Sequence, residues 1–125
     1  MIFDTDVLIW IQRGNAKAAR VVDRSTERYI SVLTYMELLQ NAQNRKQHEQ
    51  IASFLSELGF QTLPLTENIG HRAAVYVAEY TLSHGLHAAD AIIAATATEN
   101  NVHLCSGNAK HYKAIKELKL KVFRP

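Results

Sequence analysis

Three acidic side chains in this sequence stand among apolar neighbours. Asp4 follows the apolar run 1–3, Glu37 lies within Met36–Leu39, and Asp90 lies within a run rich in alanine and isoleucine. A buried carboxylate costs free energy unless a cation or hydrogen-bond donors compensate its charge. No lysine or arginine lies within four positions of any of the three, so either a bound cation or a basic side chain distant in sequence must compensate them.

A cation shared by carboxylate oxygens would be a hard metal, Mg²⁺ or Mn²⁺. Such a metal activates a water and neutralises charge on phosphoryl oxygens, so these residues suit hydrolysis of a phosphodiester. The six histidines form no zinc-binding pattern, and the sequence has neither a Gly-x-Ser-x-Gly motif nor a phosphate-binding glycine loop. The sequence therefore does not favour a zinc site, a serine hydrolase or an NTPase.

Each acid taken alone also has a structural explanation. Asp4 or Asp6 could cap the first helix, and Asp6 is the stronger candidate for a pure cap. Asp90 stands in the first turn of its helix, where the helix dipole stabilises an acid. Glu37 could lie on an exposed stripe of its helix. The combination of acids, more than any single one, favours a shared site.

Short strands alternate with helices along the chain. Strands are expected up to residue 3 and at 29–31, 60–63, 102–105 and 121–123. Helices are expected at 6–13, 16–24, 32–43, 46–58, 67–84, 87–100 and 109–118. This alternation predicts one domain over 1–125, a three-layer α/β/α sandwich with a central parallel sheet. Asp4 would lie at the carboxyl end of a central strand, where such sheets place their ligand sites.

The composition is that of an ordinary globular protein with weakly basic character. The chain has 125 residues, a formal net charge of +2 and a single cysteine, so no internal disulfide can form. A single cysteine fits a reducing compartment, and a cytoplasmic location is expected. No signal peptide is visible, and the apolar run 88–97 is too short and too interrupted to span a membrane.

Three segments resemble the signatures of PIN-domain ribonucleases, in the same order and spacing. These segments are Phe3–Leu8, Ser31–Leu38 and Ala89–Ala97. Together with the chain length, they resemble the VapC-type toxins of bacterial toxin–antitoxin pairs. The resemblance implies a PIN-like fold and a Mg²⁺- or Mn²⁺-dependent endoribonuclease that inhibits translation. It carries the roles of catalytic metal ligands onto Asp4, Glu37 and Asp90.

The resemblance also implies partners, namely an RNA substrate, a second copy of the chain and a cognate antitoxin whose tail occupies the cleft. The sequence leaves open whether transfer, ribosomal or messenger RNA is cleaved, and how the two copies are arranged.

The chain departs from the family after the fourth expected strand. Many relatives carry a further acid there, whereas this chain has Asn108 and His111 at the corresponding places. Asn108 could hold a metal-bound water or form a hydrogen bond to one of the metal ligands. Ser106 and Asp6 could act in the same ways. The number of metals, one or two, therefore stays open.

Basic residues concentrate toward the C-terminus. Lys110, Lys113 and Lys116 recur at helical spacing within the expected helix 109–118, and Arg45 is a further candidate for contact with the RNA backbone. The alternative is that these basic residues form a solvent-exposed helix face and do not contact RNA.

Two other functions compete with the nuclease. Asp4-Thr5-Asp6-Val7 also matches the first motif of haloacid-dehalogenase-type phosphatases, in which Asp4 would be the nucleophile and Asp6 the general acid/base. That chemistry needs a downstream acidic pair, which the sequence lacks. A non-catalytic PIN-like binding module is the second alternative, and the missing fourth acid is its only support.

Overall fold

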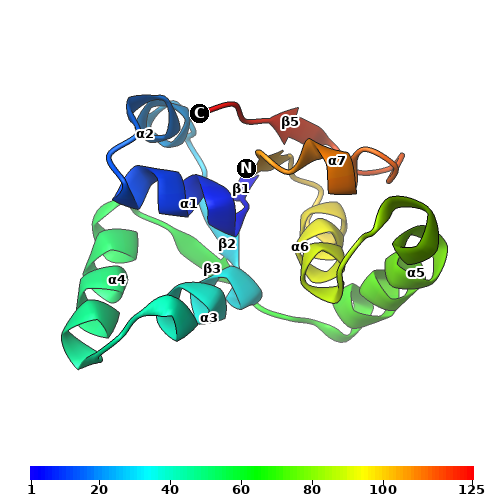
Figure 1. Cartoon of the computed structure of the whole chain (residues 1–125), viewed down its shortest axis with the longest axis horizontal. Coiled ribbons are helices and arrows are strands. Elements are labelled where there is room, and N and C mark those ends of the chain that lie inside the picture. Colours follow the sequence, from blue (N-terminus) through cyan, green and yellow to red (C-terminus); the bar gives the residue numbers. More distant parts are fainter.

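The central sheet has five parallel strands in the order β3-β2-β1-β4-β5. The computed structural model describes residues 1–125. The strands are β1 (Ile2–Phe3), β2 (Tyr29–Ser31), β3 (Gln61–Leu63), β4 (Leu104–Ser106) and β5 (Leu120–Val122). Strands β1 and β4, which are far apart in sequence, lie side by side at the centre, so the residues that follow them meet at one edge of the sheet (Figure 1).

Helices cover both faces of the sheet. The helices are α1 (Thr5–Gln12), α2 (Ala16–Asp23), α3 (Val32–Asn41), α4 (Arg45–Glu57), α5 (Glu67–His84), α6 (Ala88–Glu99) and α7 (Ala109–Tyr112). Helices α1 to α4 contribute to one apolar core, and α5 to α7 contribute to a second core on the other side (Figure 1). This arrangement confirms the predicted α/β/α sandwich with a parallel sheet. No helix combines the length and the apolar character that crossing a membrane requires.

Polar caps set the starts of the helices that hold the site. Asp4 accepts a hydrogen bond from Thr5 N at 2.8 Å and caps α1, and Ser31 accepts one from Leu33 N at 3.1 Å and caps α3. Helix α5 begins after Thr66 and ends at Gly85, whose positive φ of 66° is typical of a helix C-cap. The boundaries of these helices lie within about two residues of the predicted ones.

The predicted helix 109–118 is wrong, because α7 ends at Tyr112 and turns follow it. Ile115 N bonds to Tyr112 O and Leu118 N bonds to Ile115 O, so the backbone is tighter than an α-helix here. The buried side chains of these three residues recur every third position, and the turns direct all of them into the core. Glu117 is held by Arg72 of α5 at 2.7 Å. Lys110, Lys113 and Lys116 therefore do not lie on one continuous α-helix.

Candidate active site

A cavity of about 300 Å³ opens at the carboxyl ends of β1 and β4. It is lined by Asp4, Thr5, Asp6, Glu37, Ala89, Asp90, Ile93, Gly107 and Asn108. All three acids singled out from the sequence line this cavity, together with Asp6 and Asn108. No lysine or arginine lines it, and none forms an ion pair with any of its four carboxylates.

Asp4 is the most deeply buried acid, with 6% of its surface exposed. Its Oδ1 accepts from Thr5 N at 2.8 Å, and its Oδ2 accepts from Ser106 Oγ at 2.7 Å and from Tyr112 Oη at 3.1 Å. Burial and, to a smaller extent, the nearby Asp6 raise the pKa of Asp4, and the three donors partly oppose both effects, so that the pKa is about 6. Ser106 is itself fully buried and contacts Asp4 from behind the cavity.

Asp6 is not the helix cap that the sequence favoured, because Asp4 occupies the cap position. The side chain of Asp6 reaches across to the turn after β4, where its Oδ2 accepts from Gly107 N at 2.9 Å. Its Oδ1 is buried and has no hydrogen-bond partner. Burial raises the pKa of Asp6, which the bond from Gly107 partly offsets. A Cβ atom at Gly107 would lie 2.7 Å from this carboxylate, so the close approach requires glycine.

Glu37 is oriented by two threonines that the sequence interpretation did not identify as site residues. Thr5 Oγ1 donates to Glu37 Oε1 at 2.7 Å, and it lies 3.0 Å from Thr34 Oγ1. A hydroxyl has one proton, so Thr34 must donate to Thr5 when Thr5 donates to Glu37. The three-residue spacing of Thr34 and Glu37 on one helix was a usable signal, since residues three apart share a helix face.

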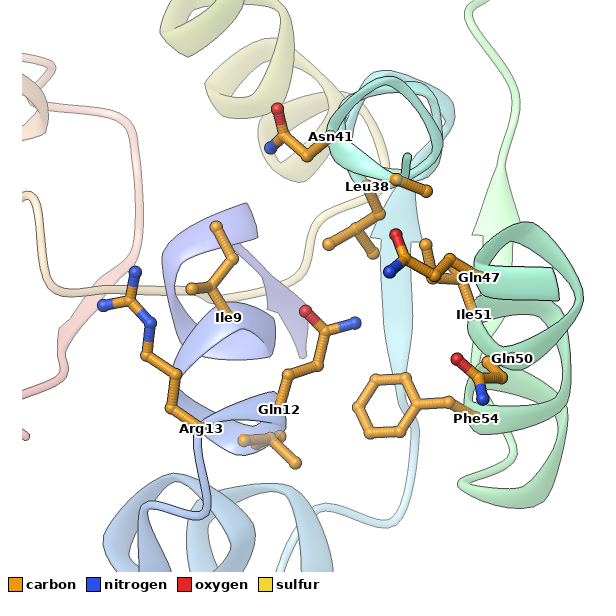
Figure 2. A pocket seen from close by; sticks show the side chains of 11 residues that line it. Ile9, Gln12, Arg13, Leu38, Asn41, Gln47, Gln50, Ile51 and Phe54 are labelled. Atoms are coloured by element: carbon orange, nitrogen blue, oxygen red, sulfur yellow. The ribbon is translucent and has the colours of Figure 1, made fainter. Parts of the chain in front are cut away.

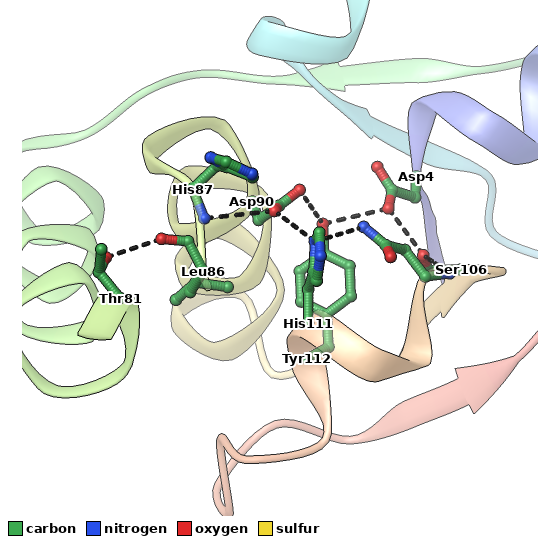
Figure 3. A network of polar contacts seen from close by, with 9 residues as sticks. Asp4, Thr81, Leu86, His87, Asp90, Ser106, His111 and Tyr112 are labelled. Atoms are coloured by element: carbon green, nitrogen blue, oxygen red, sulfur yellow. Dashed lines mark hydrogen bonds and ion pairs between the residues drawn. The ribbon is translucent and has the colours of Figure 1, made fainter. Parts of the chain in front are cut away.

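Asp90 contacts two residues of α7, His111 and Tyr112 (Figure 3). Its Oδ2 lies 3.1 Å from His111 Nδ1, and its Oδ1 lies 3.4 Å from Tyr112 Oη. Asn108 Nδ2 lies 2.8 Å from the same His111 nitrogen. Because Nδ1 carries at most one proton, it can donate to Asp90 or accept from Asn108, but not both. Burial raises the pKa of Tyr112, so its hydroxyl remains a neutral donor between the two acids.

The oxygen donors around the cavity fit a hard divalent cation. The donor set consists of carboxylates, with the unpartnered Oδ1 of Asp6 among them, and such ligands suit Mg²⁺ or Mn²⁺. Burial and the nearby Asp6 raise the pKa of Asp4, and no positively charged side chain opposes them. However, no three of the chain's His, Cys, Asp and Glu side chains gather into a ready metal-binding group. The structure thus brings the acids to one cavity but not to one coordination point, and their roles as ligands stay predictions.

The basic residues predicted to contact RNA do not line the acid cavity. Lys110 and Lys113 are exposed on α7 and at its C-terminal end. Arg45 lines a separate hollow of about 610 Å³ formed by residues of α3, α4 and the segment between them.

A larger groove of about 780 Å³ lies between α1, α3 and α4 (Figure 2). Its apolar lining includes Ile9, Leu38, Ile51 and Phe54. Polar side chains, among them Gln12, Arg13, Asn41, Gln47 and Gln50, complete the lining. No acidic side chain lines the groove, so we place the candidate active site in the smaller cavity. The groove is instead a candidate binding surface.

The fold resembles those of several solved structures. A chain of a toxin-antitoxin complex from Klebsiella pneumoniae is 28% identical, with a TM-score of 0.80 over 94% of this chain and 93% of that chain. A chain of VapBC-1 from nontypeable Haemophilus influenzae is 25% identical, with a TM-score of 0.77 over 98% of each chain. A chain of VapBC2 from Rickettsia felis, solved with a DNA fragment from its promoter, shares the fold at 19% identity, with a TM-score of 0.80 over 99% of this chain and 100% of that chain.

A comparison with curated proteins finds no significant match. The family model described as "PIN domain" matches residues 1–117, which is nearly the whole chain. The chain therefore belongs to the PIN domain family.

Proposed function

We propose that this protein is a metal-dependent endoribonuclease that hydrolyses RNA phosphodiester bonds, with 1–125 acting as one catalytic domain. PIN domains are generally nucleases, and the chain belongs to that family. The observation that carries the proposal is the acid cavity, in which four carboxylates surround about 300 Å³ and no lysine or arginine is among the lining residues. Asp4, Glu37 and Asp90 are the proposed ligands of Mg²⁺ or Mn²⁺.

In this proposal, the bound metal would activate a water and neutralise charge on the phosphoryl oxygens. Other side chains of the protein hold the proposed metal ligands in place. Ser106 and Tyr112 donate to the same oxygen of Asp4, which fixes that carboxylate, and Thr5 fixes Glu37. Asp6, through Gly107, holds the turn that carries Asn108 at the rim of the cavity. These supporting contacts keep the ligands from rearranging when substrate binds.

The experiment is an RNA cleavage assay with purified protein in Mn²⁺, in Mg²⁺ and in EDTA. We expect cleavage that depends on the metal and that Asp4→Ala or Asp90→Ala abolishes. A phosphomonoester is tested in parallel. Turnover of that compound without RNA cleavage, lost in Asp6→Ala, would replace the nuclease with the phosphatase alternative. Equal cleavage by the Asp90→Ala protein would remove Asp90 from the metal site.

We further propose that the protein is the toxin of a toxin–antitoxin pair, that it inhibits translation, and that an antitoxin encoded beside it is its partner. The support is the structural likeness to chains of toxin-antitoxin complexes. The groove between α1, α3 and α4 offers an apolar floor for an amphipathic segment of that partner. Growth arrest on expression, relieved by the adjacent gene product, is the expected result. Ile9→Glu in the groove should prevent the relief, whereas Leu82→Glu, at a 99% exposed position, should not.

A homodimer is the remaining proposal about assembly. Several large apolar side chains are about half exposed, including Met36, Leu65 and Val75, and burying them would favour association. Sedimentation equilibrium at micromolar concentration is expected to give twice the chain mass. A monomer under these conditions would contradict it.

A further inference from the structure

A further cavity, of about 340 Å³, is surrounded by positive charge. Five of its nine lining residues are basic and none is acidic. The basic residues are Lys17, Arg20, Arg24, Lys121 and Arg124, which we call the basic surface. All five side chains are exposed, and none of them takes part in an ion pair or a side-chain hydrogen bond within the chain. These charges are therefore available to a partner.

Two distant parts of the sequence build the basic surface. Lys17, Arg20 and Arg24 are spaced three and four residues apart, so they follow one face of α2 and its C-terminal end. The opposite face of α2 buries Ala18 and Val22 in the core, which forces the basic face outward. Lys121 and Arg124 come from β5 and the residues just after it, at the edge of the sheet. Sequence spacing reveals the α2 stripe, but only the tertiary structure adds the second segment.

The basic surface and the acid cavity share the same stretch of backbone. Cys105 lines the basic surface, and the next residue, Ser106, donates to Asp4. Phe123, which also lines the basic surface, donates its backbone N–H to Ser106 O at 2.8 Å. Its carbonyl oxygen would lie 3.3 Å from a Cβ atom at Gly107, the residue that binds Asp6. Residues at the ends of β4 and β5 therefore connect the two sites.

The acid cavity and the basic surface carry opposite charges. Without a metal, a cavity lined by four carboxylates repels a phosphate chain, so the protein's own side chains there cannot supply affinity for a nucleic acid. Five unpaired cations repel one another as well, and a polyanion relieves that repulsion while its condensed counterions are released. Lys110, Lys113 and Arg45 line neither this cavity nor the acid cavity.

We propose that the basic surface binds the phosphodiester backbone of the RNA substrate beside the acid cavity, so that the neighbouring stretch of the strand enters the cavity. This inference rests on the proposed endoribonuclease function and assigns the surface that holds its substrate. Contacts to phosphates position a strand without reading its sequence. The basic surface would therefore contribute affinity and orientation, and base selection would come from elsewhere.

The test measures binding separately from cleavage. The full-length protein is titrated into a fluorescently labelled single-stranded RNA in EDTA, and anisotropy gives the Kd at several salt concentrations. The variant Lys17→Gln/Arg20→Gln/Arg24→Gln is compared with Arg13→Gln/Lys46→Gln/Lys119→Gln, which removes the same net charge from exposed positions that line neither cavity. Thermal unfolding confirms that both variants fold.

We expect the α2 variant to bind RNA at least about tenfold more weakly, and its plot of log Kd against log salt to be shallower by about 2, as the loss of three phosphate contacts predicts. The matched variant should stay within about threefold of the unmodified protein. Equal weakening by both variants, or no weakening by the α2 variant, would overturn the proposal. Tighter binding of duplex DNA than of RNA through the same residues would overturn the choice of RNA. Binding through the basic surface without cleavage in Mn²⁺ would instead count against the proposed nuclease alone.

Discussion

Tyr112 donates its hydroxyl to Oδ2 of Asp4 at 3.1 Å, although 108 positions separate the two residues in sequence. Ser106 donates to the same oxygen at 2.7 Å. Two neutral donors therefore stand behind the most buried acid of the cavity. They stabilise its charge without cancelling it, which leaves a negative charge for a cation to bind.

Removing the Tyr112 hydroxyl should weaken both the fold and the site. Tyr112→Phe keeps the ring but deprives Asp4 of one donor, which we expect to cost about 1–2 kcal/mol of unfolding free energy at pH 7. Mn²⁺ affinity and RNA cleavage should fall together, because the carboxylate is less firmly held. Urea denaturation and calorimetric Mn²⁺ titration measure these effects. Tyr80→Phe, at a half-buried tyrosine outside the cavity, is the control, and a matching loss in it would refute the assignment.

Asp4 should make the metal-free protein less stable as pH rises. Its pKa is about 6 in the folded chain and 3.8 as the ordinary value, so the folded state binds more protons between these values. Stability contributed by this group is present below pH 4 and is lost as pH rises toward 6. Asn is also a good helix cap, so Asp4→Asn should be up to about 3 kcal/mol more stable than the unmodified protein at pH 7.5 and nearly equal to it at pH 4.

The measurement is urea unfolding of both proteins in EDTA across this pH range. Adding Mn²⁺ at pH 7.5 should raise the stability of the unmodified protein only. A stability difference that does not change with pH would show that Asp4 is not the group responsible.

A methyl group at position 107 should damage the site. The Cβ of Gly107→Ala would lie 2.7 Å from Asp6 Oδ2 and 3.3 Å from Phe123 O, so the carboxylate or the turn must move. We expect a loss of about 1–3 kcal/mol of stability and at least about a tenfold fall in cleavage rate.

Gly70→Ala is the matched control for that change. Gly70 lies within α5 and has nothing within 4 Å of its added Cβ, so this variant should gain about 0.5–1 kcal/mol. Thermal unfolding and the RNA assay compare the two alanine variants, and full activity in Gly107→Ala would rule out a role for this close contact.

Thr5 should act on cleavage through Glu37. Thr5→Val keeps the shape of the side chain but removes the hydroxyl that donates to Glu37 at 2.7 Å, and we expect at least about a tenfold lower kcat. Thr5→Ser restores the hydroxyl and should recover most of the rate. Kinetics on a defined RNA distinguish the two variants. If serine fails to restore what valine removes, the hydrogen bond is not the cause.

Much of the framework was predictable because it depends on local patterns. The alternation of strands and helices predicted the layered parallel sheet, and the apolar settings of Asp4, Glu37 and Asp90 indicated the acids that line one cavity. The prediction failed at 109–118, where one continuous helix was expected and α7 ends at Tyr112. There, burial of Tyr112, Ile115 and Leu118 is achieved by tight turns, and helical periodicity alone cannot distinguish such turns from an α-helix.

The sequence by itself determined the order of the elements, because backbone preferences act over a few neighbouring residues. Its three signature segments indicated the family, and the apolar neighbours of three acids indicated which acids form the site. The tertiary structure decided which side chains meet. Residues of α2 and of the end of β5 together form the basic surface. Asp6 does not cap a helix but accepts a hydrogen bond from Gly107 N, and Tyr112 donates a hydrogen bond to Asp4. These contacts join residues about 100 positions apart. They form only when strands far apart in sequence pair within one sheet, and no local pattern encodes that pairing.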